Sequence, residues 1–258
     1  MSRISSLAAV AVAAMMVFGA SAASARSIDA IKKAGTIIVA TEGQYAPFNF
    51  FEGSKLTGFE VDLMEGVAKK MGLKIEWKTL GFDALLTGLG QDRWDLVIAS
   101  HGITDERAKA VTFTNPHYCS GGAIVTKNAA LKTAKDLAGK VIAVQTGTSY
   151  LESAQKIPGV KEVKNFPKDP DAQAAVASGR ADVWVTDKFV AIEMLKTNKN
   201  TGLTATGMLF VEKIAAAAAK GNQGVADAYN KALGEYMAKG GGYDALTMKY
   251  FGEDVRCK

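Results

Sequence analysis

Thr36-Ile37-Ile38-Val39-Ala40-Thr41 is a run of β-branched and small apolar residues that follows Gly35. A run of this kind predicts a buried β-strand. Further along, apolar residues recur at helical spacing from Glu60 to Met71 and stop at Gly72, which predicts a helix that ends at this glycine. Three more elements are predicted in turn: a strand around residues 75–77, a helix that opens at Phe82, and a buried strand at residues 95–99.

The second half of the chain continues this alternation. Strands are predicted at residues 140–145, 160–166 and 181–185, and helices from near Tyr150, at 171–178 and at 226–239. Strands that alternate with helices indicate an α/β fold with parallel strands. The segment from Ile214 to Ala219 is one isoleucine and five alanines, and local propensity alone predicts a helix there.

The first 25 residues have the features of a secretory signal peptide. Arg3 is the basic start, residues 7–20 are almost wholly apolar, and Ala23-Ser24-Ala25 is a small-residue cleavage site. The alternative is a transmembrane anchor, but the apolar run is shorter than the roughly 20 residues that a span requires. We expect cleavage before Arg26 and a soluble periplasmic protein, without a lipid anchor because the leader has no cysteine.

Composition and charge narrow the classes of function. Of the 258 residues, 48% are hydrophobic and 22% are charged, which is typical of a globular protein. Only two cysteines are present, Cys119 and Cys257, and this excludes a disulfide-dense scaffold. The net charge of +5 raises the question of nucleic-acid binding. Because the lysines are scattered, without arginine-rich or aromatic-interleaved clusters, we expect no nucleic-acid partner.

Searches for catalytic and metal-binding motifs find almost nothing. His101 and His117 lie too far apart for a helical metal pair, and the G-x-S-x-G and H-E-x-x-H motifs do not occur. No base is evident beside Cys119, so a structural role is the better interpretation of that cysteine. We therefore expect no metal, no cofactor and no enzymatic activity.

Polar side chains instead follow the carboxyl ends of the predicted strands, where ligands bind in open α/β sheets. Arg107 has a planar guanidinium that suits a carboxylate, and free backbone N–H groups at Thr148 and Ser149 also favour an anion. Asp187 and Glu42 would attract a cationic group. Together these residues predict a receptor for a zwitterion.

Two neighbouring motifs form a specific pattern: Ile103-Thr104-Asp105-Glu106-Arg107, followed by Phe113-Thr114-Asn115-Pro116-His117-Tyr118. Five further stretches occur in matching order, at residues 42–48, 56–63, 94–99, 145–148 and 178–182. In these stretches the chain resembles the extracellular solute-binding proteins, family 3, of polar amino-acid ABC transporters. The resemblance covers essentially all of the sequence after the leader.

This resemblance implies a two-lobed α/β fold, the type II periplasmic-binding-protein-like fold. Each lobe would be a mixed, mainly parallel sheet flanked by helices, and two hinge strands would cross between the lobes. Residues 26–118 and 210–258 would form the first lobe, and residues 119–209 the second. The strand order of the family makes the segment Ile214–Ala219 a strand near the hinge, contrary to its propensity.

The resemblance also implies roles at the ligand site. Arg107 is expected to pair with the α-carboxylate of the ligand and Asp187 to accept its α-ammonium, while Tyr45 and Phe82 enclose its side chain. Glu42 stands where many relatives have aspartate and favours glutamine or a cationic amino acid. His101 and Gly102 depart from the small or hydroxyl residues that are common at their positions. The full expected set is Glu42, Tyr45, Phe82, Ser100, His101, Gly102, Arg107, Thr148, Ser149 and Asp187.

The implied function is that of an exported receptor that captures a polar amino acid by hinge closure. It would act as a monomer and deliver the amino acid to the membrane permease of an ABC importer. One alternative is an exported enzyme on the same scaffold, similar to cyclohexadienyl dehydratase, with Glu42 as its general acid. Another alternative is a receptor for a different small carboxylate, or a sensor without transport.

The two cysteines invite a bridge in an exported protein. Cys119 directly follows Tyr118, where the resemblance places the first hinge crossing, and Cys257 lies in a tail that should return toward the hinge. We therefore predict a Cys119–Cys257 disulfide.

Overall fold

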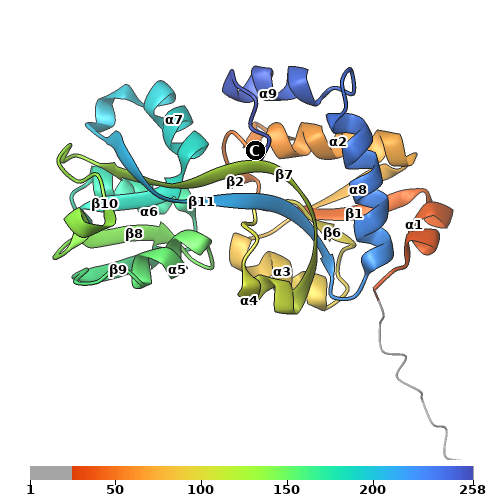
Figure 1. The fold of residues 1–258 in the computed structure, drawn as a ribbon, viewed down its shortest axis with the longest axis horizontal. Helices are drawn as coiled ribbons and strands as arrows, with labels where there is room; N and C mark the ends of the chain where they lie inside the picture. Colours follow the sequence, from red (N-terminus) through yellow and green to blue (C-terminus); the bar gives the residue numbers. More distant parts are fainter. Residues whose placement is uncertain (1–24, 258) are drawn as a thin grey trace, which may run out of the picture.

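The computed structural model describes residues 25–257, so residues 1–24 of the predicted signal peptide lie outside the described part of the chain. Within that part, strands form one eight-stranded sheet and one three-stranded sheet (Figure 1). The strands are β1 (Thr36–Thr41), β2 (Gln44–Tyr45), β3 (Asn49–Glu52), β4 (Lys55–Thr57), β5 (Lys74–Thr79), β6 (Leu96–Val97), β7 (Val111–Thr126), β8 (Val141–Gln145), β9 (Glu162–Phe166), β10 (Val183–Asp187) and β11 (Thr204–Ala219). The α-helices are α1 (Ile28–Ala34), α2 (Phe59–Met71), α3 (Phe82–Gly90), α4 (Asp105–Ala110), α5 (Ser149–Gln155), α6 (Asp169–Ala177), α7 (Lys188–Thr197), α8 (Gln223–Met237) and α9 (Tyr243–Phe251).

Two long strands connect the two ends of the large sheet, whose order is β5-β1-β6-β11-β7-β10-β8-β9. At one end β1 pairs in parallel with β5 and β6, and at the other β8 pairs in parallel with β9 and β10. Between them β7 and β11, each 16 residues long, run antiparallel and pass from one lobe to the other (Figure 1). The predicted two-lobed α/β fold is therefore confirmed. The residue boundaries of the lobes stay a prediction.

The alanine-rich end of β11 is a strand, as the resemblance implied and local propensity did not. Its side chains alternate between two buried clusters. Ile214, Ala216 and Ala218 pack with residues of α2 and α8, whereas Ala217 and Ala219 pack with residues of α3. Because both faces are covered, the segment has no alternation of polar and apolar residues that would mark it as a strand. Pairing with β6 and β7 outweighs the small helical preference of alanine.

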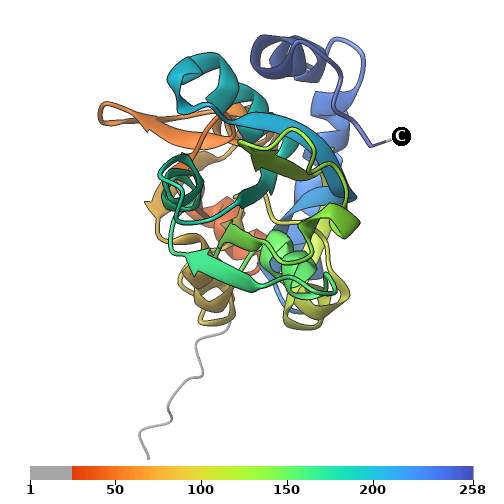
Figure 2. The same cartoon turned by 90° about the vertical axis from the view of Figure 1, so that its left-hand side faces the viewer.

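Most of the predicted elements occur within a few residues of their expected positions, because their local signals agree with the packing. Gly72 ends α2 with a left-handed φ of 71° and donates its N–H to Ala68 and Lys69. The strand predicted at residues 95–99 is shorter, since only Leu96–Val97 is paired as β6. The motif stretch at residues 42–48 contains β2, the first strand of the small sheet β2-β3-β4, which projects beside α7 (Figure 2).

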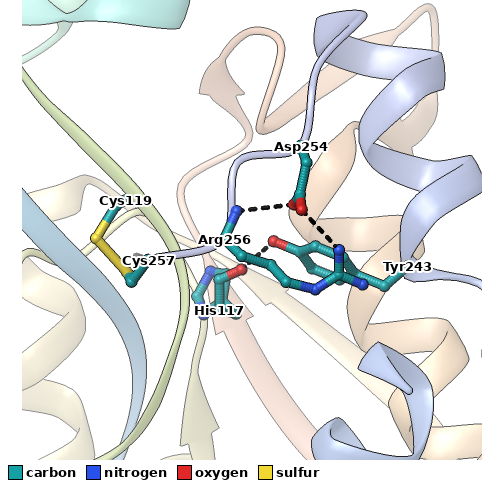
Figure 3. The surroundings of a disulfide bond; sticks show 6 residues. All are labelled: His117, Cys119, Tyr243, Asp254, Arg256 and Cys257. Carbon is teal, nitrogen blue, oxygen red and sulfur yellow. Dashed lines mark hydrogen bonds and ion pairs between the residues drawn. A yellow bond between two sulfur atoms is a disulfide. The ribbon is translucent and has the colours of Figure 1, made fainter. Parts of the chain in front are cut away.

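The predicted Cys119–Cys257 disulfide is present, and it ties the C-terminal tail to β7 (Figure 3). The backbone N–H of Cys119 donates to the carbonyl of Val255 at 2.9 Å. The Arg256 guanidinium lies 4.5 Å from the centre of the Tyr243 ring, and the Tyr243 hydroxyl donates to the carbonyl of His117 in β7. The tail is therefore attached to a crossing strand by covalent, polar and aromatic contacts. None of the helices within residues 25–257 is long and apolar enough to span a membrane.

Candidate ligand-binding site

A small cavity lies where the two lobes meet, and seven of the ten predicted ligand-binding residues line it. Its volume is about 10 Å³, little more than one water-sized sphere, so the walls must separate to admit an amino acid. Of the other predicted residues, His101 and Gly102 adjoin lining residues and Asp187 is buried behind them. The lining consists of Glu42, Tyr45, Phe82, Ser100, Arg107, Gln145, Thr148, Ser149 and Tyr150.

Arg107 connects the two lobes. It lies in α4, whose first turn is fixed by Thr104, because the Thr104 hydroxyl accepts the Arg107 N–H at 3.2 Å. The side chain is largely buried, and its guanidinium donates to the carbonyl of Gly102 at 2.8 Å and to that of Gly147 at 2.9 Å. Burial lowers the pKa of Arg107, and the negative charge of Glu212 opposes this effect. Two of the five N–H donors are used, so the fork can still bind an anion.

The segment before Arg107 is held by a buried carboxylate that the sequence analysis did not identify. Ser100 has a φ of 55°, in the left-handed region, and Glu60 accepts both its backbone N–H at 2.8 Å and its hydroxyl at 3.0 Å. His117 also contacts Glu60, at 2.9 Å. Glu60 thereby fixes the turn that precedes His101 and Gly102.

His101 and Gly102 each contact a residue that lines the cavity. The His101 ring stacks on Phe82 with centroids 4.3 Å apart and planes 13° apart, and burial keeps its pKa well below the usual range. The segment is also tied to β11, since the Ala215 N–H donates to the His101 carbonyl at 3.1 Å. A neutral His101 is therefore a flat support for Phe82, and the Gly102 carbonyl orients Arg107.

The opposite wall comes from the turn between β8 and α5. Thr148 is the N-cap of α5, accepting the Leu151 N–H at 3.2 Å, and it donates its hydroxyl to the Gln145 carbonyl at 2.7 Å. The Ser149 hydroxyl donates at 2.7 Å to Glu212 of β11. The sequence analysis missed Glu212, because nothing in the sequence around it marks a ligand site.

Glu42 is a buried carboxylate in the cavity. Gln145, at the end of β8 in the other lobe, donates a hydrogen bond to Glu42 at 2.7 Å. Burial raises the pKa of Glu42 to about 7, and the hydrogen bond from Gln145 only partly opposes that rise. A second buried carboxylate, Asp169, accepts hydrogen bonds from Trp184 at 2.9 Å and Thr186 at 3.1 Å, and burial raises its pKa to about 7 as well.

Asp187 lies at the end of β10 and caps α7. One carboxylate oxygen accepts the Phe189 N–H at 2.7 Å, and the other accepts the Tyr150 hydroxyl at 3.4 Å. The Tyr45 hydroxyl in turn accepts the Asp187 N–H at 3.4 Å. Asp187 is fully buried, and burial raises its pKa to about 7. The two tyrosines thus lie in contact with it, and both line the cavity.

The described residues contain no cluster of three or more His, Cys, Asp or Glu side chains that could hold a metal ion. The cavity instead combines one guanidinium, one buried carboxylate and aromatic rings at the junction of two lobes. A fold and cavity of this kind define a small-molecule binding protein.

Comparisons with known proteins agree with this class. Residues 37–253 match the family model of bacterial extracellular solute-binding proteins, family 3, and the chain therefore belongs to that family. The L-cystine-binding protein TcyJ of Escherichia coli K12 is 37% identical over 234 residues, which cover 88% of this chain and 87% of TcyJ. Members of the family are extracellular or periplasmic solute-binding proteins.

Solved structures show the same fold. An ancestral arginine-binding protein bound to arginine has a TM-score of 0.80 and 39% identity, covering 84% of this chain and 99% of its own. The ancestral amino acid-binding protein AncCDT-1, a precursor of cyclohexadienyl dehydratase, has a TM-score of 0.79 and 31% identity, covering 86% and 98%. The proteins to which this chain is similar bind amino acids, which supports the predicted class of function.

Proposed function

We propose that this protein is the receptor of an ABC importer for a polar amino acid, which it captures in the periplasm as a monomer. The observation that carries the proposal is the Arg107 guanidinium. It is buried between the lobes, donates to a carbonyl from each of them, and lines the cavity together with the buried carboxylate of Glu42. A fixed cation and a carboxylate in one cavity match a ligand with one carboxylate and at least one ammonium group.

In this proposal the two charged ends of the amino acid bind to different lobes. The free N–H groups of Arg107 take the α-carboxylate, with help from the backbone near Gly102 and Thr148. Asp187 accepts the α-ammonium from the other lobe. Because each lobe supplies part of the recognition, the complete set of contacts exists only in the closed form, and ligand binding favours closure. The bodies that move are residues 26–118 with 210–258, and residues 119–209.

The side chain of the amino acid would lie between Tyr45 and Phe82, with its polar end at Glu42. An ionised Glu42 favours a cationic end, whereas a protonated Glu42 can donate to an amide oxygen. With a pKa of about 7, both forms are populated near neutral pH, which is consistent with arginine, lysine or glutamine. Arginine is the ligand in one of the similar structures, and L-cystine that of the relative TcyJ.

A thermal-shift screen of the twenty amino acids, L-cystine and small organic acids tests the proposal. At least one polar amino acid should raise the melting temperature, and calorimetry should then give a dissociation constant of about 1 μM or tighter, which corresponds to about 8 kcal/mol. A screen in which organic acids bind and no amino acid does would refute the amino-acid receptor.

A second candidate function is an exported dehydratase on the same scaffold. Glu42 favours it, because a buried carboxyl with a pKa of about 7 can act as a general acid near neutral pH. Incubating the protein with a series of cyclic carboxylic acids, and following product by absorbance, tests this activity. The matched control is Glu42→Gln, which should abolish turnover if Glu42 is the acid.

A further inference from the structure

The carboxylate of Glu212 occupies an unusual place in this site. Glu212 lies in the middle of β11 and pairs with Ser120 of β7, where the two crossing strands pass between the lobes. Its Oε2 accepts the hydroxyl hydrogen bond of Ser149, which lines the cavity from the second lobe. Ser149 also lines a neighbouring cavity whose lining includes Glu212, so a crossing strand holds a carboxylate directly beside a residue of the candidate site.

Gly102 lacks a side chain, which leaves space for the Glu212 carboxylate. A Cβ atom built on Gly102 would lie 2.0 Å from Glu212 Oε2 and 3.5 Å from the Ser149 hydroxyl oxygen. Glu212 therefore packs directly against the backbone of Gly102, in the space that a serine or threonine side chain would fill. A charged group from a distant strand therefore takes the space beside Gly102.

One oxygen of this carboxylate is left without a hydrogen-bond donor. Oε1 of Glu212 is buried and has no partner within residues 25–257, and no lysine, arginine or histidine of that range forms an ion pair with Glu212. Burying a carboxylate oxygen without a donor is unfavourable. A bound molecule that supplies N–H donors at this point would remove that cost.

We propose that Glu212 is a ligand-contacting residue that binds the ammonium group of the amino acid together with Asp187. This inference rests on the proposed function. It leaves Arg107 free for the carboxylate, and it makes recognition of the ammonium depend on a crossing strand as well as on both lobes. The site would then select strongly for a protonated amine over an uncharged substituent at the α-carbon.

The test compares amino acids with analogues that lack the α-amino group. The pairs are L-arginine with 5-guanidinopentanoic acid, L-glutamine with glutaramic acid, and L-cystine with 3,3′-dithiodipropionic acid. Dissociation constants are measured by calorimetry for wild type, Glu212→Gln, Glu212→Ala and Arg107→Ala. The glutamine variant keeps an oxygen that can accept the Ser149 hydroxyl, so it removes the charge while retaining the bond to α5.

Glu212→Gln should weaken binding of the amino acid roughly 10- to 100-fold, the range for a charged hydrogen bond, and should change binding of its amine-free analogue less than about threefold. Equal losses for both members of a pair, or a Gln variant that matches wild type, would overturn the inference. If Glu212→Gln binds like wild type, while Glu212→Ala loses the same affinity for both members of a pair, then Glu212 has a structural role through its hydrogen bond with Ser149. If Glu212→Gln does not fold, Glu212→Ala, which also removes the charge, carries the same comparison between the members of each pair.

The two proposals fail in different ways. If wild type binds an amino acid and Arg107→Ala abolishes that binding, but Glu212 variants do not discriminate within the pairs, only the role of Glu212 is wrong. If wild type binds none of the three amino acids, the proposed function is wrong for these ligands, and the inference about Glu212 is overturned with it.

Discussion

Replacing Arg107 with alanine is the perturbation that bears most directly on the site. The guanidinium already donates to the carbonyls of Gly102 and Gly147, so the substitution leaves a buried acceptor at Gly102 and a partly buried acceptor at Gly147 without this donor even before ligand binds. We expect the free protein to be destabilised by about 1–3 kcal/mol for this reason. This loss must be separated from the loss of affinity, which is the quantity of interest.

The magnitude for binding follows from the remaining donors of the fork. Two charged hydrogen bonds to the ligand carboxylate would contribute roughly 1.5–3 kcal/mol each. Truncating one partner of such a buried pair costs about 2–5 kcal/mol, since the other charge is left buried and unpaired. Arg107→Ala should therefore weaken amino-acid binding about 30- to 5,000-fold. Arg107→Lys should recover only part of this loss, because an ammonium lacks the planar fork.

Isothermal titration calorimetry with the best amino acid from the screen is the assay, and thermal unfolding verifies that each variant folds. Arg180→Ala is the matched control, because Arg180 is an exposed arginine whose guanidinium donates only to the nearby Ser178 hydroxyl. It should bind like wild type. A loss of less than tenfold in folded Arg107→Ala protein would refute the assignment of Arg107 to the ligand carboxylate.

Three further predictions concern pH and covalent stability. Since burial raises the pKa of Asp187 to about 7, lowering the pH to about 5 should protonate this carboxylate and weaken amino-acid binding, measured by calorimetry, by up to about 100-fold. A constant affinity would argue against Asp187 as the ammonium acceptor. The pKa of Asp169 is also raised to about 7, so the folded state binds the proton more tightly and stability falls as pH rises between about 4 and 7. Asp169→Asn should reduce the fall in melting temperature across this window without abolishing it, because the pKa values of Glu42 and Asp187 are raised to about 7 as well, and an unchanged slope would contradict the prediction. The Cys119→Ser and Cys257→Ser double variant should melt roughly 10–20 °C lower than wild type. The bridge joins residues 138 positions apart, and closing such a loop contributes about 4–5 kcal/mol in the chain-entropy model. An unaltered melting temperature would show that the bridge does not stabilise the fold.

Much of the fold could be predicted from local sequence because the signals and the packing agree. Residues 36–41 and 140–145 are apolar runs that form β1 and β8, and Gly72 ends α2 where the periodicity stops. The β11 segment could not be predicted in this way. Its alanines favour a helix weakly, and only pairing with β7, and with β6 at Ala217 and Ala218, makes the extended form more stable.

The residues of the candidate site were likewise predicted only in part from the sequence. Arg107, Thr148 and Asp187 follow predicted strands, so their residue types and positions were enough to propose them, and the structure brings the first two together around one cavity. Gln145 and Tyr150 flank the predicted turn and were overlooked, although they line the same cavity. Glu60 was quoted only as part of a motif, and its role in fixing Ser100 depends on a contact across 40 residues of sequence.

By itself, the sequence determined the class of the protein: alternating strands and helices, an ordered set of motifs, and one arginine among acidic residues at strand ends. Only the tertiary structure decided that Asp187 is fully buried and that Glu212 lies against Gly102. The physical reason is that residue type and local periodicity reflect short-range preferences. Burial, the pKa values that follow from it, and contacts between residues 110 positions apart exist only once the two crossing strands have brought distant segments together.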